Sequence, residues 1–251
     1  MGLKGSLFWN TLRLHQWVAK QSNLRLLTIP RGDFTCIRTM GYDAVSKPAL
    51  GLYEKGGDYC RHRAIELARE EIGDKPGNVA ELGVYKGETA KVINHAFPDR
   101  KLFLYDTFSF FDGGPLETKD GTSARNYAEA HRNNASPSFD GTEILKKCLP
   151  YSENCVFRKG YFPDTAAPDA DEKFIFVSID VDFCDTVYKG LEFFYPRLLE
   201  GGYLFLAVYN FACENDVDRR CKQALIDAEK AFGPFKKVPL PDWRGTLVIV
   251  K

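Results

Sequence analysis

The sequence predicts an α/β fold in which a mostly parallel sheet is covered by helices on both faces. Short apolar runs of strand length alternate with longer runs whose apolar residues recur at helical spacing, which is the pattern of β–α units. The strongest strand-like run, residues 173–179, is almost continuously apolar, as strands buried on both faces are. At 251 residues, 44% of them hydrophobic and 27% charged, the chain suits one large globular domain.

Seven stretches have the length and composition of strands. They are residues 78–82, 101–105, 155–159, 173–179, 203–208, 236–240 and 246–250. The last two flank a turn sequence, Pro-Asp-Trp-Arg-Gly at 241–245, and should pair antiparallel. We therefore expect a seven-stranded, mostly parallel sheet with an antiparallel strand at its C-terminal end.

The expected helices alternate with these strands. They are residues 1–21, 59–72, 89–97, 141–148, 186–199 and 217–232. The apolar face of the helix at 59–72 is expected to consist of Ala64, Ile65, Leu67, Ala68 and Ile72. We divide the chain into an N-terminal accessory segment of helix and loop, 1–57, and a main domain, 58–251. A long polar segment at 108–134 interrupts the alternation, and loops of this length are often functional.

Charge and cysteine content exclude several classes of protein. The 34 basic and 34 acidic residues give a formal net charge of zero, which argues against a nucleic-acid-binding protein. No run is long and apolar enough to span a membrane. The seven cysteines are odd in number and contain no Cys-x-x-Cys pair, which favours reduced thiols in a cytoplasmic protein. Trp9 and Trp17 need burial, either against the domain or in a homodimer.

The chain is organised around residues 79–89, Val-Ala-Glu-Leu-Gly-Val-Tyr-Lys-Gly-Glu-Thr. They predict a buried strand, a glycine turn and the start of a helix. Gly83 and Gly87 would let the backbone approach a ligand closely, and such turns hold nucleotide-like ligands in α/β sheets. The alternative is an ordinary tight turn. The Gly-x-x-x-Gly spacing differs from that of dinucleotide sites, which disfavours an NAD-dependent dehydrogenase.

Acidic residues follow several of the predicted strands. Glu81, Asp106, Asp180 and Asp182 should gather in one crevice, because ligands in such sheets bind at the carboxyl ends of the strands. A carboxylate cluster suits a cationic cofactor, a divalent metal or a general base. Asp180 and Asp182 have a second interpretation as residues that cap the next helix.

S-adenosylmethionine fits this pattern, because it combines a sulfonium cation with a ribose and lacks a pyrophosphate. Asp106 would accept hydrogen bonds from the ribose hydroxyls. The aromatic rings of Tyr85 and Phe108 would stack on the cofactor or meet its cation.

Five motifs occur in order along the chain. They are Glu-Leu-Gly-Val-Tyr-Lys-Gly at 81–87, Tyr-Asp-Thr-Phe at 105–108, Gly-Tyr-Phe-Pro-Asp-Thr at 160–165, Ile-Asp-Val-Asp-Phe at 179–183 and Tyr-Pro-Arg-Leu-Leu-Glu-Gly-Gly at 195–202. In these motifs, from about residue 78 onward, the chain resembles the macrocin O-methyltransferase family. Those enzymes methylate sugar hydroxyls of macrolides and related natural products, using S-adenosylmethionine and a magnesium ion.

The resemblance implies a Rossmann-like class I methyltransferase whose acceptor is a small glycoside or saccharide. It implies a cofactor site formed by Glu81, Gly83, Tyr85, Gly87, Asp106 and Thr107. It also implies that Asp180 is a metal ligand, that Asp182 lies near the acceptor hydroxyl and that residues 108–134 form part of the acceptor wall.

One departure from the family concerns the metal. After the strand that follows the Gly-Gly pair, the family has two consecutive aspartates before a tyrosine, whereas this chain has Ala207 and Val208. Neither side chain can bind magnesium, which takes oxygen ligands. A sugar hydroxyl would then need a protein base, for which Asp182 and His131 are the candidates. The sequence is thus compatible with an O-methyltransferase that has an incomplete metal site, or with a catalytically inactive module that binds S-adenosylmethionine.

Overall fold

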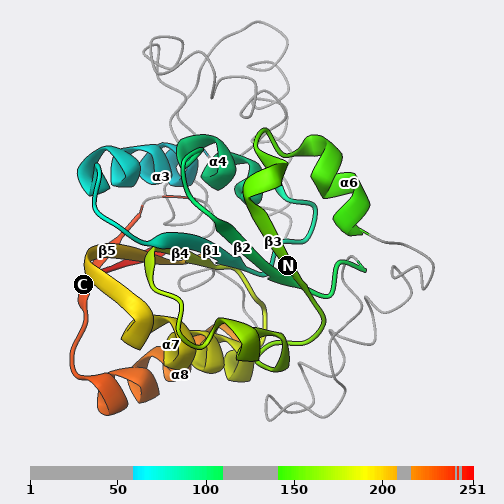
Figure 1. Cartoon of the computed structure of the whole chain (residues 1–251). Helices are drawn as coiled ribbons and strands as arrows, with labels where there is room; N and C mark the ends of the chain where they lie inside the picture. The colour runs from blue at the N-terminus through cyan, green and yellow to red at the C-terminus, as the bar shows by residue number, and fades with distance from the viewer. Residues whose placement is uncertain (1–58, 110–140, 208–215, 241, 243–244) are drawn as a thin grey trace, which may run out of the picture.

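The computed structural model describes residues 59–109, 141–207, 216–240, 242 and 245–251 (Figure 1). Several sequence-based expectations lie outside these residues. They concern the segment 1–57 with its helix and the homodimer contact, His131 and most of the segment 108–134, and Val208.

The structure confirms the seven-stranded sheet. Its strands are β1 Asn78–Leu82, β2 Leu102–Asp106, β3 Cys155–Lys159, β4 Phe174–Ile179, β5 Leu198–Leu206, β6 Lys236–Pro239 and β7 Leu247–Val250. The strand order is β3-β2-β1-β4-β5-β7-β6, in which β3 to β5 run parallel and β7 is antiparallel to both of its neighbours. The mostly parallel sheet with an antiparallel C-terminal strand is therefore as predicted.

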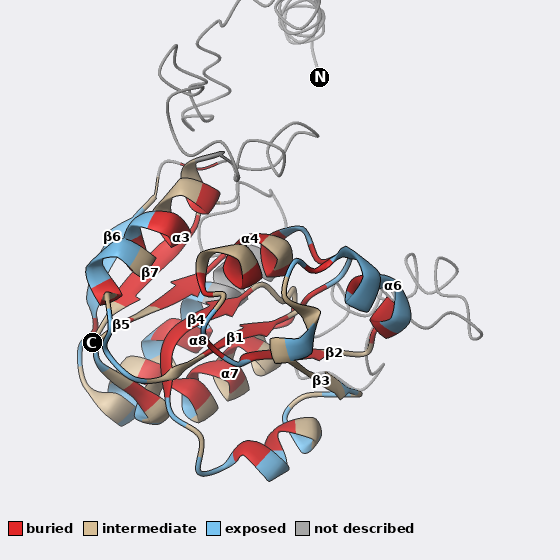
Figure 2. Ribbon diagram, turned by 45° about the horizontal axis from the view of Figure 1, so that its top comes forward, coloured by how far each residue is buried: buried red, intermediate tan, exposed pale blue. Residues whose placement is uncertain are grey.

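Helices cover both faces of the sheet. They are α3 Tyr59–Ile72, α4 Glu88–Ala96, α6 Gly141–Cys148, α7 Cys184–Arg197 and α8 Asp216–Phe232, with short 3₁₀ turns at η2 Ser152–Asn154 and η3 Asp164–Asp169. Helices α3, α4 and α6 lie on one face, and α7 and α8 lie on the other (Figure 1). Their inward sides are buried against the strands, as the red surfaces in Figure 2 show. Among the described residues, no helix has the length and apolar character needed to cross a membrane.

Two details differ from the sequence-based expectations. Helix α7 ends at Arg197, and β5 begins at Leu198, so the Gly-Gly pair at 201–202 lies inside the strand. The pairing of β5 with β4 is irregular there, and a Cβ at Gly202 would lie 2.9 Å from the Ile175 carbonyl oxygen, which explains why glycine is needed. Leu67, expected on the buried face of α3, is 45% exposed.

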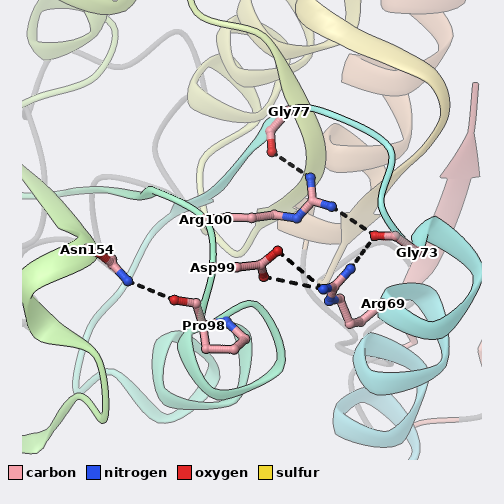
Figure 3. Close-up of polar contacts among 7 residues, drawn as sticks. All are labelled: Arg69, Gly73, Gly77, Pro98, Asp99, Arg100 and Asn154. Carbon is pink, nitrogen blue, oxygen red and sulfur yellow. Dashed lines mark hydrogen bonds and ion pairs between the residues drawn. The ribbon is translucent and has the colours of Figure 1, made fainter.

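A buried arginine fixes the start of β1, at the end of the strands opposite the predicted site. The Arg100 guanidinium donates to the carbonyl oxygens of Gly77 at 2.8 Å and Gly73 at 3.0 Å (Figure 3). Arg69 of α3 also donates to the Gly73 carbonyl and contacts Asp99 at 3.3 Å. These contacts provide hydrogen-bond donors for carbonyl groups of the loop between α3 and β1, which would otherwise be buried unpaired.

Candidate functional site

Four strand ends meet at the carboxyl edge of the sheet. Leu82 at the end of β1 is in register with Tyr105 of β2 and with Ile179 of β4, and Ile179 is in register with Leu206 of β5. Asp106 is the last residue of β2, and Gly83, Asp180 and Ala207 directly follow β1, β4 and β5. These four residues are therefore neighbours. The structure thus brings the glycine turn together with two of the predicted carboxylates.

The Asp106 carboxylate binds the backbone of the glycine turn. Its Oδ2 accepts hydrogen bonds from the backbone N–H groups of Val84 at 2.7 Å and Tyr85 at 2.9 Å. Its Oδ1 accepts from the N–H of Phe108 at 2.8 Å. Hydrogen bonds to a charged acceptor are about twice as strong as neutral ones. Asp106 therefore organises the turn, a function that the sequence analysis did not anticipate.

Two of the residues bound by Asp106 have left-handed backbone conformations. The φ angle is 49° at Tyr85 and 53° at Phe108, a conformation that costs a non-glycine residue about 1–2 kcal/mol. Phe108 is 1% exposed, and its ring contacts that of Phe157 with centroids 5.6 Å apart. The Tyr85 ring, in contrast, is 51% exposed at the carboxyl edge. Strained backbone of this kind is concentrated at functional sites.

The two glycines of the turn are required by packing within the protein. Both have positive φ angles, 87° at Gly83 and 76° at Gly87. A Cβ would lie 2.2 Å from the Asp180 carbonyl oxygen at the first position, and 2.2 Å from the Leu145 side chain at the second. These contacts are with the end of β4 and with α6, and the approach of a ligand to these glycines stays a prediction.

The remaining predicted residues lie on or beside the same edge. Thr107 is half-buried and accepts a hydrogen bond from the Ser109 hydroxyl at 2.9 Å. Glu81 is 1% exposed and, by strand alternation, faces the α3 and α4 side of the sheet. Asp182 is half-buried between β4 and α7.

The side chain of Tyr105 supports the end of β2 from the opposite face. Its hydroxyl donates to Asp169 at 2.9 Å, and both burial and this hydrogen bond raise the pKa of Tyr105 far above its ordinary value. Arg158 binds both oxygens of the same Asp169 carboxylate. Tyr105 therefore stays protonated and serves as a fixed support beneath the site.

A buried ion pair lies beside the glycine turn. The Arg61 Nη1 atom is 2.9 Å from Asp180 Oδ2, and the two side chains are only 5% and 12% exposed. The Nη2 atom of Arg61 donates to the Thr89 hydroxyl at 3.0 Å. The guanidinium thereby connects α3, the end of β4 and the first turn of α4.

The sequence analysis missed Arg61, although a signal was present. Arg61 precedes Ile65 by four residues and Ile72 by eleven, so it lies on the buried stripe of α3. A charged residue on such a stripe implies a buried partner, because an unpaired charge is too costly to bury. The partner, Asp180, is 119 positions away and could not be identified from spacing alone.

The residues at this edge do not fit a magnesium ion. The expected ligand, Asp180, is bound by a guanidinium, and the neighbouring Ala207 offers no oxygen on its side chain. Within the described ranges, no group of three or more His, Cys, Asp and Glu side chains is placed to hold a metal. Magnesium requires near-octahedral oxygen ligation, which this set does not supply.

Comparisons with known proteins agree with this architecture. A curated relative, demethyldecarbamoylnovobiocin O-methyltransferase of Streptomyces niveus, is 25% identical over 174 residues. The match covers 64% of this chain and 65% of that protein, so the chain spans slightly less than two thirds of the relative. Two solved structures share the fold. The O-methyltransferase NovP has a TM-score of 0.60 at 23% identity, covering 76% of this chain and 79% of NovP. The calicheamicin methyltransferase CalS11 has a TM-score of 0.55 at 15% identity, covering 85% and 86%.

The sequence profile of the macrocin-O-methyltransferase family matches residues 34–230. This match begins well before residue 78, where the motif resemblance starts, and covers most of the chain. The protein therefore belongs to the macrocin-O-methyltransferase family.

Proposed function

We propose that the protein is an S-adenosylmethionine-dependent O-methyltransferase that methylates a hydroxyl of a sugar-containing natural product or saccharide. The observation that carries this proposal is the glycine turn at the carboxyl edge of the sheet, which Asp106 holds in a strained conformation in a chain of this family. The Streptomyces niveus relative is named demethyldecarbamoylnovobiocin O-methyltransferase, which supports the same reaction class.

The residues at the edge suit S-adenosylmethionine in their chemistry. Tyr85 is exposed, and its ring already lies 5.2 Å from a cation, the Lys86 ammonium. We propose that this ring also contacts the cofactor. A carboxylate has about four lone-pair positions, and at Asp106 three of them accept backbone N–H groups while the Thr107 hydroxyl lies 3.5 Å from Oδ1. We propose that a ribose hydroxyl takes the place of this long contact. We propose that Glu81, Gly83, Gly87, Thr107 and Phe108 complete this site, and that residues 58–251 form the methyltransferase domain.

When bound, S-adenosylmethionine would supply a methyl group from its sulfonium sulfur. The acceptor oxygen would receive this methyl group, the electron pair of the carbon–sulfur bond would stay on sulfur, and a protein base would take the hydroxyl proton. Asp182 is our candidate for that base, because it is half-buried beyond β4 at the same edge. His131, which lies outside the described residues, is the second candidate. A positioned base typically contributes about 10²- to 10⁴-fold.

A catalytically inactive module that binds S-adenosylmethionine is the alternative function. Ala207 favours it, because this position lacks the carboxylate that the family resemblance led us to expect. In either case we propose a small-molecule ligand, neither nucleic acid nor a membrane as partner, and a cytoplasmic location.

Calorimetric titration with S-adenosylmethionine, followed by transfer of a radiolabelled methyl group to a glycoside panel, tests the proposal. We expect saturable binding and formation of S-adenosylhomocysteine with at least one acceptor. Binding without transfer to any acceptor would favour the inactive module. Absence of binding would refute both functions.

A further inference from the structure

The Asp180 carboxylate forms an ion pair with a buried arginine. Asp180 is the residue that the family resemblance assigns to the metal, and its Oδ2 atom lies 2.9 Å from Arg61 Nη1. Arg61 is only 4% exposed, so packing holds its side chain in place beside Asp180. The same guanidinium also donates a hydrogen bond to Thr89.

A guanidinium and a divalent cation exclude each other at this carboxylate. Magnesium would need an Asp180 oxygen about 2.0–2.1 Å away and would then lie close to a permanently charged arginine. Repulsion between the two cations would force Arg61 away from Asp180. An arginine so displaced would remain buried without its partner, which is strongly unfavourable.

The neighbouring strand end supports the same conclusion. The N–H of Ala207 donates to the carbonyl oxygen of Ile179 at 2.9 Å, which places residue 207 directly beside the start of the Asp180 segment. Ala207 is fully buried, and its methyl group cannot ligate a metal. The position next to Asp180, where the family resemblance implies a metal ligand, therefore holds an apolar side chain.

We infer that Arg61 takes the place of the divalent cation in this protein, so that the cofactor and acceptor bind without a metal. Arg61 is a positioning residue, since it acts through Asp180 and Thr89 to hold α3 and α4 against the end of β4. The inference rests on the proposed function, because it states how that site is neutralised.

Manganese titration followed by electron paramagnetic resonance tests the inference directly, because the signal of free Mn²⁺ disappears on binding. We expect no binding to the wild-type protein, with or without S-adenosylmethionine. Binding that is abolished in Asp180→Asn would overturn the inference. Calorimetry with S-adenosylmethionine, in EDTA and in excess magnesium, should give the same affinity, and an affinity that depends on magnesium would also overturn it.

A set of variants isolates the contribution of Arg61. The double variant Ala207→Asp/Val208→Asp restores two carboxylates but keeps Arg61, and it should bind Mn²⁺ poorly. Adding Arg61→Ala should tighten Mn²⁺ binding by at least about tenfold, a change detectable in a titration. Equal binding by the double and triple variants would show that Arg61 does not block the site.

Arg63→Ala is the matched control for the third substitution. Arg63 is on the same helix, and its guanidinium pairs with Glu66 at 2.9 Å and Glu70 at 3.3 Å, so its removal should not improve Mn²⁺ binding. If Arg61→Ala does not fold, Arg61→Met replaces it, because methionine keeps most of the side-chain volume. The titration of the wild-type protein needs no variant. If S-adenosylmethionine does not bind, only the proposed function is refuted. The difference in Mn²⁺ binding between the double and triple variants does not depend on the cofactor.

Discussion

Replacing Asp106 by asparagine should release the glycine turn. In its better orientation the amide oxygen keeps the hydrogen bonds from Val84 and Tyr85, and the amide NH₂ faces the N–H of Phe108. One buried N–H then loses its acceptor, at a cost of about 1–3 kcal/mol. The two retained bonds change from charged to neutral and weaken by about 1 kcal/mol each. This total loss of about 3–5 kcal/mol compares with a combined strain of about 2–4 kcal/mol at the two left-handed residues, so the turn should relax.

Two measurements separate the consequences of this relaxation. Hydrogen exchange at the amides of residues 84, 85 and 108 should become faster, and calorimetry should show S-adenosylmethionine affinity reduced by about 10²-fold or more. The control is Asp99→Asn, because the Asp99 side chain is 54% exposed and its ion pair with Arg69 lies at the surface. Such a change should alter stability by less than about 0.5 kcal/mol and leave binding intact.

The outcome can contradict this reasoning in two ways. If Asp106→Asn loses binding while exchange at the three amides stays at the wild-type rate, Asp106 acts by contacting the ligand and not by ordering the turn. If both binding and exchange are unchanged, neither function is correct.

Four further predictions concern separate parts of the molecule. Gly83→Ala should abolish S-adenosylmethionine binding in calorimetry, because its Cβ would lie 2.2 Å from the Asp180 carbonyl oxygen; full affinity would contradict this. Asp182→Asn should lower kcat by about 10²- to 10⁴-fold with little change in cofactor affinity, whereas an unaltered kcat would exclude it as the base. Burial raises the pKa of the Cys155 thiol to about 12, so folding favours the protonated thiol. Stability should therefore decline as pH rises from about 9 towards 12, less steeply in Cys155→Ala, as urea unfolding at each pH would show. Arg100→Ala should lower the free energy of unfolding by about 1–3 kcal/mol without changing cofactor affinity, because it leaves the partly buried Gly77 carbonyl without its donor, whereas the Gly73 carbonyl keeps Arg69.

The sequence was sufficient to predict the sheet because its strands are buried on both faces. The apolar run of β4 and the alternation of strands with helices reflect packing that any parallel sheet imposes. The boundary between α7 and β5 was wrong because the Gly-Gly pair at 201–202 normally ends a helix. Here the contact of Gly202 with β4 and backbone hydrogen bonds to Lys251 hold the pair within a strand. Propensity is local, whereas this strand extension depends on a tertiary contact.

The site was predictable in position but not in its contacts. Carboxylates at strand ends must lie at one edge, so the proximity of Asp106 and Asp180 to the glycine turn follows from topology alone. Which groups those carboxylates bind depends on distances that only the folded chain sets. Asp106 binds three backbone N–H groups, and Asp180 binds an arginine of α3, a helix that comes before every strand of the sheet.

Arg61 and Ala207 together explain how the charge of Asp180 is neutralised. Three carboxylates around a divalent cation carry a net charge of −1, and Asp180 paired with Arg61 carries none, so the two arrangements differ by one unit. The two arrangements therefore have similar net charges, but they differ in the chemistry that they offer to an acceptor hydroxyl. A metal lowers the pKa of a bound water from about 15.7 to about 7, and it can bind an alkoxide directly. A guanidinium whose N–H groups are committed to Asp180 and Thr89 neutralises charge without offering an open coordination position. In the proposed reaction, removal of the acceptor proton therefore depends on an acidic acceptor hydroxyl or on a protein base, for which Asp182 and His131 are the candidates.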